Sequence, residues 1–152
     1  MPDPTLRTAA WVLLLVATAV AMEPISAAVH RRLGHGIAWG LHRSHHERPV
    51  RGPEPNDVIP AISAGITMGL FALGTWVAAL WWLVPVAAGA TAYGLVYFAV
   101  HDLYIHRRLP LLPRHIGFLE PYREAHLLHH RTGTDCWGIF SKVPQRVRVS
   151  SG

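Results

Sequence analysis

The sequence contains a single cysteine, Cys136, and this scarcity limits the kinds of centre that the chain can hold. One thiol forms no disulfide within the chain, offers no Cys-x-x-Cys pair, and cannot supply the four thiolates of an iron–sulfur cluster. The sequence also lacks a glycine-rich fingerprint after a strand pattern, of the kind that binds a nucleotide or a flavin. We therefore expect no bound flavin or haem and no reductase of the chain's own.

Charged residues are also few, at 15% of the sequence against 51% hydrophobic residues. The formal net charge of +5 would by itself suit a nucleic-acid partner. The basic residues, however, are mostly arginines beside apolar runs, with no RNA-binding aromatic motif among them. Charge that flanks membrane spans explains this arrangement better. We therefore expect contact with membrane lipid and no nucleic-acid partner.

Two apolar stretches are long enough to cross a bilayer, which takes about 20 helical residues. Residues 8–29 contain one charged side chain, Glu23. This run is longer than the core of a usual signal peptide and follows a poor basic segment, so we predict a retained span. Residues 58–100 contain no charged side chain and would make a helix about twice as long as a bilayer needs. We therefore predict spans at about 8–29, 58–74 and 76–100.

Histidine is the residue type that the chain concentrates. Ten of its eleven histidines lie in four boxes, and each half of the chain carries an H-x4-H box followed by an H-x2-H-H box. Neutral imidazole is the commonest metal ligand, and the recurrence of one spacing points to metal binding. The predicted metal ligands are His30, His35, His42, His45, His46, His101, His106, His126, His129 and His130. We expect the eleventh, His115, to be an ordinary residue.

The two kinds of box differ in helical geometry. In H-x2-H-H, positions i, i+3 and i+4 share one face of an α-helix. In H-x4-H, the two side chains lie about 140° apart around an α-helix. Such a pair either straddles a broad face or needs a local bulge to meet one ion. The spacing does not assign individual histidines to individual ions.

The predicted spans also give a topology. Two crossings separate the boxes in residues 30–46 from those in residues 101–130, so all four boxes face one side. The arginines agree, because ten of them lie on the histidine side. By the positive-inside rule that side is the cytoplasm. The sequence thus predicts one membrane domain over residues 1–152, all-α, with three to four transmembrane helices and a cytoplasmic histidine-rich helical cap.

The ligand type narrows the choice of metal. An all-nitrogen site suits Fe(II), Zn, Cu or Ni and disfavours Mg and Ca. Ten histidines exceed what two closed zinc sites need, which favours two irons with positions open for O2, although composition alone leaves zinc possible. Metal-bound histidines usually donate their second N–H to a carboxylate or carbonyl. The predicted supporting residues are Asp57 and Asp102 beside the boxes, and Glu23, because an acid inside a span is costly and hence functional.

Residues before and between the boxes carry a more specific resemblance. They are Met22-Glu23-Pro24, Trp39-Gly40-Leu41 before His42, Asn56-Asp57, Tyr93 and Tyr97 before His101-Asp102, and Tyr122-Arg123-Glu124-Ala125 before His126. Together with the boxes, this run resembles the bacterial β-carotene 3-hydroxylases of the membrane fatty-acid hydroxylase and sterol desaturase superfamily. The resemblance extends over most of the chain, from about Met22 to Phe140.

The resemblance implies a non-haem di-iron monooxygenase of carotenoid biosynthesis, an oxidoreductase in the bacterial plasma membrane. Its ten box histidines would hold two Fe ions, with zinc possible in the purified protein. It would use O2 and two electrons, from a ferredoxin-type donor, to hydroxylate C3 of the β-ionone ring. β-Carotene, a lipid-soluble carotenoid, would become β-cryptoxanthin and zeaxanthin.

Two alternatives remain at the level of sequence. One is a carotenoid ketolase, or a sterol or fatty-acid hydroxylase or desaturase, with the same metal site. The other is a non-enzymatic, histidine-rich membrane metal transporter. A transporter should place ligands inside its spans or on both faces, whereas these boxes gather on one side, which disfavours this alternative.

Overall fold

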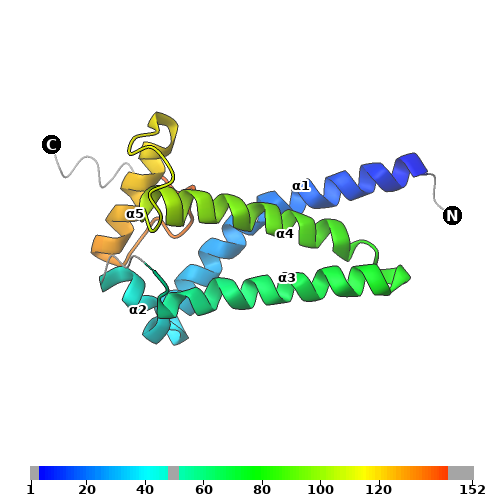
Figure 1. Cartoon of the computed structure of the whole chain (residues 1–152), viewed down its shortest axis with the longest axis horizontal. Coiled ribbons are helices and arrows are strands. Elements are labelled where there is room, and N and C mark those ends of the chain that lie inside the picture. Colours follow the sequence, from blue (N-terminus) through cyan, green and yellow to red (C-terminus); the bar gives the residue numbers. More distant parts are fainter. Residues whose placement is uncertain (1–3, 48–51, 144–152) are drawn as a thin grey trace. The chain divides into compact units, whose positions relative to one another are not determined.

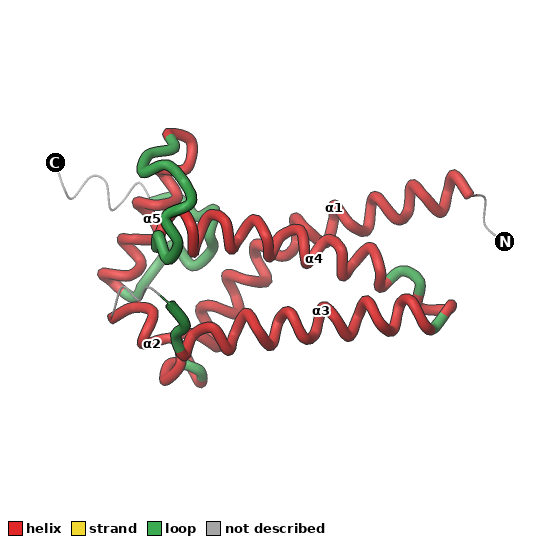
Figure 2. Tube along the Cα trace, viewed as in Figure 1, coloured by secondary structure: helices red, strands yellow, loops and turns green. Residues whose placement is uncertain are grey.

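The computed structural model describes residues 4–47 and 52–143. All regular secondary structure in these ranges is helical (Figure 2), which confirms the predicted all-α fold. Three helical stretches are long and apolar enough to cross a membrane, namely Thr5–Ile37, Pro55–Trp76 and Leu83–Ile105. Arg48 and Arg51, which entered the topology argument, lie outside the described residues.

The described residues contain five α-helices in chain order (Figure 1). They are α1 (Pro4–Val29), α2 (Trp39–Glu47), α3 (Val58–Trp76), α4 (Leu83–Tyr97) and α5 (Glu120–Thr132). Two π-helices continue α1 and α4, at His30–Ile37 and Phe98–Ile105. Short 3-10 turns occupy Pro55–Asp57, Ala78–Leu80 and Gly117–Leu119.

The chain divides into two compact units. The first comprises Met1–Met22 and Asp57–Val96, which hold most of the apolar helical residues. The second comprises Glu23–Asn56 and Tyr97–Gly152, and every box histidine belongs to it. The histidines are therefore brought together within one unit.

In the first unit, the long uncharged stretch reverses later than predicted. α3 continues to Trp76, and α4 begins at Leu83 after a short turn. Gly74 is buried, and a Cβ there would come within 2.9 Å of the Val84 backbone nitrogen, so the end of α3 packs directly against the start of α4. Pro85 stands in the first turn of α4, where its missing N–H breaks no hydrogen bond.

α1 and α4 also approach closely in this unit. A Cβ at Gly89 of α4 would overlap the carbonyl oxygen of Leu15 in α1 and lie 2.9 Å from Thr18 Cβ. Only glycine permits this close contact with the backbone of α1, and small residues at such contacts let two apolar helices pack closely.

The second unit also contains buried side chains other than the histidines. Tyr104 of the second π-helix is 1% exposed, and Ile139 is 2% exposed. The Tyr104 hydroxyl donates to the Glu120 carboxylate and accepts from the Ile116 N–H at 2.9 Å. The bond to Glu120 fixes the start of α5. The helix ends before Gly133, which has the left-handed conformation with φ 65°. α5 thereby holds the last histidine box in place.

Candidate metal centre

Each H-x4-H box coincides with a π-helix, and His106 is the residue that directly follows the second one. Of the two geometries that the spacing allowed, a broad helical face or a local bulge, the structure has the second. Bonds of the i to i+5 type are present, from His106 N–H to His101 O at 2.9 Å and from Ala38 N–H to Leu33 O at 2.8 Å. Residues five apart are then one turn apart and share a face. The ring centroids are accordingly 5.1 Å apart for His30 and His35, and 4.5 Å apart for His101 and His106.

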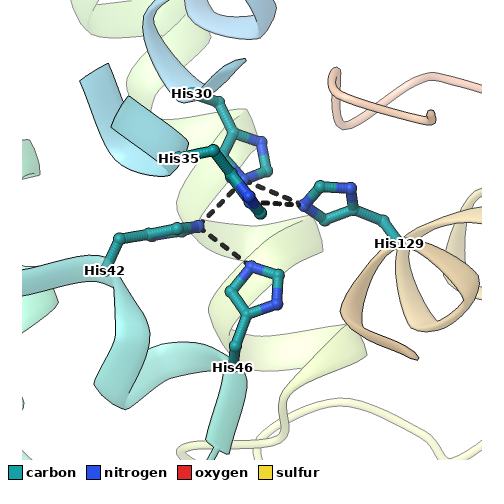
Figure 3. A group of neighbouring side chains, drawn as sticks. All are labelled: His30, His35, His42, His46 and His129. Atoms are coloured by element: carbon teal, nitrogen blue, oxygen red, sulfur yellow. Dashed lines mark hydrogen bonds between the residues drawn. The ribbon is translucent and has the colours of Figure 1, made fainter. Parts of the chain in front are cut away.

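The first cluster of imidazoles combines three chain segments (Figure 3). Each ring offers a nitrogen within 4.8 Å of all the others, and the rings point inward toward one another. The members are His30 and His35 from the first π-helix, His42 and His46 from α2, and His129 from α5. Their Nε2 atoms are separated by 2.9 Å (His30–His42), 3.0 Å (His35–His129), 3.1 Å (His42–His46) and 3.2 Å (His30–His129).

The second cluster takes the remaining box histidines. His45, His106, His126 and His130 offer nitrogens within 4.8 Å of one another. His101 adjoins them, with its Nε2 3.1 Å from that of His45. The shortest contact joins Nε2 of His106 and His126 at 2.9 Å. The consecutive pairs are thus divided, because His45 and His130 belong here while His46 and His129 belong to the first cluster.

The hydrogen bonds determine which ring nitrogen carries the proton in the first cluster. Nδ1 of His30 lies 2.8 Å from the Trp137 carbonyl oxygen, and Nδ1 of His129 lies 2.9 Å from the Asp135 carbonyl oxygen. Carbonyl oxygens only accept, so both Nδ1 atoms donate and each neutral ring keeps its lone pair on Nε2. Those two lone pairs face each other at 3.2 Å. A cation bound between them would turn this repulsive contact into coordination.

The second cluster shows the same arrangement. Nδ1 of His45 donates to Glu54 at 2.9 Å, and Nδ1 of His101 lies 3.3 Å from the Asp102 carboxylate. Their Nε2 lone pairs therefore also face each other. In addition, the buried Nε2 of His130 has no hydrogen-bond partner within the described part of the chain. Buried polar atoms are seldom left unpaired, and a metal ion would satisfy this one.

The distances fit a transition metal. Two nitrogens at right angles around an ion about 2.1 Å from each would be roughly 3 Å apart. The observed Nε2 separations of 2.9 to 3.2 Å agree with this value. Nitrogen-only ligand sets favour Fe, Zn, Cu or Ni.

Comparison with known families supports this interpretation. Residues 15–147 match the model of the fatty acid hydroxylase family. The chain belongs to the fatty acid hydroxylase family. No solved structure matches it significantly.

Several curated relatives are similar in sequence to most of this chain. A beta-carotene hydroxylase of Paracoccus sp. (strain N81106) is 42% identical over 122 residues, which cover 78% of this chain and 73% of the relative. A beta-carotene hydroxylase of Pseudescherichia vulneris is 42% identical over 87% of this chain and 77% of its own length. The chloroplastic beta-carotene 3-hydroxylase 1 of Arabidopsis thaliana is 38% identical over 77% of this chain and 39% of its own length. The predicted resemblance to bacterial β-carotene hydroxylases is therefore confirmed.

In this hydroxylase-family chain, burial keeps the clustered imidazoles neutral. Desolvation, followed by repulsion from neighbouring imidazoles, holds the pKa values of His45, His106 and His130 far below their usual range. The same two causes, led by desolvation, lower the pKa of His46 to about 4. These rings are therefore neutral at pH 7, which is the form that binds metal.

The predicted supporting acids have different positions. Asp102 adjoins His101 and accepts from Arg108 at 2.9 Å. Glu23 accepts a backbone N–H, from Phe140 at 2.8 Å. Of the Asn56-Asp57 pair, Asn56 reaches a box histidine, since its Oδ1 accepts from Nδ1 of His42 at 2.8 Å. Asp57 is the N-terminal flanking residue of α3 and belongs to the first unit, and its supporting role stays a prediction.

Sequence reasoning missed two supporting residues, Glu54 and Asn56. Both follow box two in a segment that has no helical period, so no pattern places them. The available signal was that Glu54 stands between Pro53 and Pro55, two residues that restrict the backbone on either side of its carboxylate. His115, as expected, is outside the clusters, with Nδ1 3.3 Å from Glu120 and a side chain 76% exposed.

Glu54 yields a testable prediction. Its side chain is 3% exposed and accepts the Nδ1 proton of His45, so Glu54→Leu leaves that proton without an acceptor. We expect metal affinity at one site to fall by about 10- to 100-fold, the usual effect of losing a bond that orients a ligand. Metal titration of the purified variants measures this, with Glu47→Leu as the control because Glu47 is exposed and forms an ion pair within α2, with Arg43. Equal affinities for Glu54→Leu and the native chain would contradict the assigned role.

Proposed function

We propose that this chain hydroxylates C3 of carotenoid β-ionone rings in an O2-dependent reaction, converting β-carotene to β-cryptoxanthin and zeaxanthin. The observation that carries the proposal is 42% identity to bacterial beta-carotene hydroxylases over most of both chains. Insertion of one oxygen atom into a C–H bond consumes O2, two electrons and two protons, and releases water. A ferredoxin-type protein is the proposed electron donor.

Two irons are the proposed cofactor. One would be held by the first cluster and the other by the second, so that all ten box histidines serve as ligands. Together with O2 and electrons, bound iron would supply the oxidising power for an unactivated C–H bond, which no side chain provides. The clusters adjoin, because the rings of His46 and His130 stack at 4.3 Å with an interplanar angle of 9°. This supports a single two-metal centre.

The protein's own groups orient the ligands and shield them from water. Asn56, Glu54 and two backbone carbonyls accept the Nδ1 protons and aim the Nε2 atoms inward. Two indoles cover the first cluster, since the Trp39 ring lies 5.2 Å from that of His35 and the Trp137 ring lies 4.9 Å from it. Trp39 is 38% exposed, so we assign to it the contact with an apolar substrate.

We place the protein as a single domain in the bacterial plasma membrane, with its histidine boxes on the cytoplasmic side. The three apolar helical stretches support membrane insertion. The arginines that follow α1 and the second π-helix support the orientation, by the positive-inside rule. A carotenoid dissolved in the bilayer could then reach the centre laterally, and electrons could arrive from the cytoplasm.

Pigment analysis tests the proposed substrate. Bacteria that accumulate β-carotene should form zeaxanthin or β-cryptoxanthin when they express this chain, and an empty vector should leave β-carotene unchanged. A product with a conjugated carbonyl would instead identify a ketolase. Unchanged β-carotene in cells that contain folded, iron-loaded protein would overturn the substrate assignment.

A further inference from the structure

We propose that Glu23 is a positioning residue for the first histidine cluster and acts through residues 135–141, which we call the C-terminal strap. The inference rests on the metal centre proposed above and adds to it the device that orients two of its ligands. It follows from contacts within the second compact unit.

The strap supplies backbone acceptors to two ligands from opposite halves of the chain. The Trp137 carbonyl accepts from Nδ1 of His30 at 2.8 Å, and the Asp135 carbonyl accepts from Nδ1 of His129 at 2.9 Å. These bonds set the tautomer and the direction of both rings. A backbone acceptor has no rotamer of its own, so its position depends on the conformation of the whole strap.

That conformation is not one that the strap adopts by local preference. Asp135 and Cys136 have φ values of 52° and 50°, in the left-handed region that is unfavourable for residues other than glycine. Such residues persist where surrounding structure holds them. The strap therefore needs an anchor outside itself.

Glu23 provides the anchor from α1. Its carboxylate accepts the Phe140 N–H at 2.8 Å, and it lies so close to Gly138 that a Cβ there would overlap the carboxylate oxygen. An acidic side chain within an apolar helical stretch is costly to bury. The hydrogen bond to Phe140 gives a structural reason for its presence there. Glu23 stands seven residues before His30, about two helical turns, so one helix presents both the anchor and the ligand.

The strap has a second attachment that does not depend on Glu23. Ile139 is 2% exposed and Cys136 is 8% exposed, so apolar burial still fixes the strap to the unit when the carboxylate is lost. Replacing Glu23 should therefore loosen the strap's register and leave the protein folded.

Metal binding to the purified full-length chain tests this role. We expect Glu23→Leu to weaken binding of Fe(II) at one of two sites by about 10- to 100-fold and to leave the other site unchanged. Glu23→Gln keeps an oxygen acceptor for the Phe140 N–H, so its binding should stay within a few-fold of the native chain. Glu54→Leu is the matched variant for the second cluster.

Combined variants separate positioning from general destabilisation. Adding Glu23→Leu to His30→Ala should cause less than the sum of the two single losses, because His30 is one of the two ligands that the strap orients. Adding it to Glu54→Leu should weaken both sites. Additive losses with His30→Ala, equal losses at both sites in Glu23→Leu, or failure of Glu23→Gln to restore binding would each overturn the proposal.

A measurement without metal completes the test. In the metal-free native chain, the Phe140 amide should exchange slowly with deuterium, and Glu23→Leu should speed its exchange while α5 keeps its protection. Unchanged exchange would contradict the anchor, and a native chain that binds no metal would overturn the role together with the metal centre. Neither readout uses a carotenoid, so a chain that binds two metals but leaves β-carotene unchanged would contradict the proposed substrate alone.

Discussion

His129→Ala is expected to abolish hydroxylated product, a loss of at least about 100-fold, because a direct ligand should matter more than the residues that orient it. His129 is 0% exposed, and its Nε2 lies 3.0 and 3.2 Å from those of His35 and His30. It is the member of the first cluster that α5 contributes. Alanine leaves a buried gap where the ligand was. Pigment composition and iron content of the expressed variant measure the effect.

His45→Ala is the corresponding variant for the second cluster and should have the same effect on product. Each variant should lose one metal and retain the other, because His45 and His129 belong to different clusters. The control is His115→Ala, which changes an exposed histidine that pairs with Glu120. A folded His129→Ala protein with more than about a tenth of native activity would contradict the ligand role, because even loss of an orienting bond usually costs that much.

Removing metal from the purified protein is expected to lower its thermal midpoint by roughly 10 °C. Ligand held at about 1,000 times its dissociation constant stabilises the folded state by about 4 kcal/mol, and each kcal/mol shifts the midpoint of a chain of this size by about 2 to 4 °C. The physical source is the set of Nε2 lone pairs that face one another at 2.9 to 3.2 Å inside the protein. Thermal unfolding in detergent, before and after chelation, measures the shift.

Returning Fe(II) to the chelated protein should restore the midpoint. The control is the His45→Ala, His129→Ala double variant, whose midpoint should respond little to chelation because each cluster lacks a ligand. Identical midpoints for the native protein with and without metal would show that the clusters contribute no metal-linked stability.

The sequence predicted the helical class of this protein from simple physical patterns. Long runs without charge predicted apolar helices. This prediction needs no knowledge of tertiary contacts, because the length of an apolar run can be counted in the sequence. The break between α3 and α4 was less accurate, since it lies at residues 77–82 where we predicted residue 75. Gly74 near the end of α3 packs against Val84 at the start of α4, and a contact between two helices of this kind has no local sequence pattern.

The residues that support the histidines also differ in how far the sequence predicts them. Asp102 follows His101 directly in the chain, so its place beside that ring was predictable. Glu54 meets His45 from nine residues along the chain, and Glu23 meets Phe140 over 117 residues of sequence. Contacts of this kind depend on how distant segments fold back, which spacing within one segment does not specify.

The sequence by itself determined which residue types are available, that the chain is all-α with apolar helices, and the family to which it belongs. Only the tertiary structure decided how the boxes combine. Neighbours such as His45 and His46 differ by about 100° around a helix and so face different partners. Which partners they meet depends on the packing of α2 and α5 with the two π-helices, because each cluster is assembled from side chains on both halves of the chain.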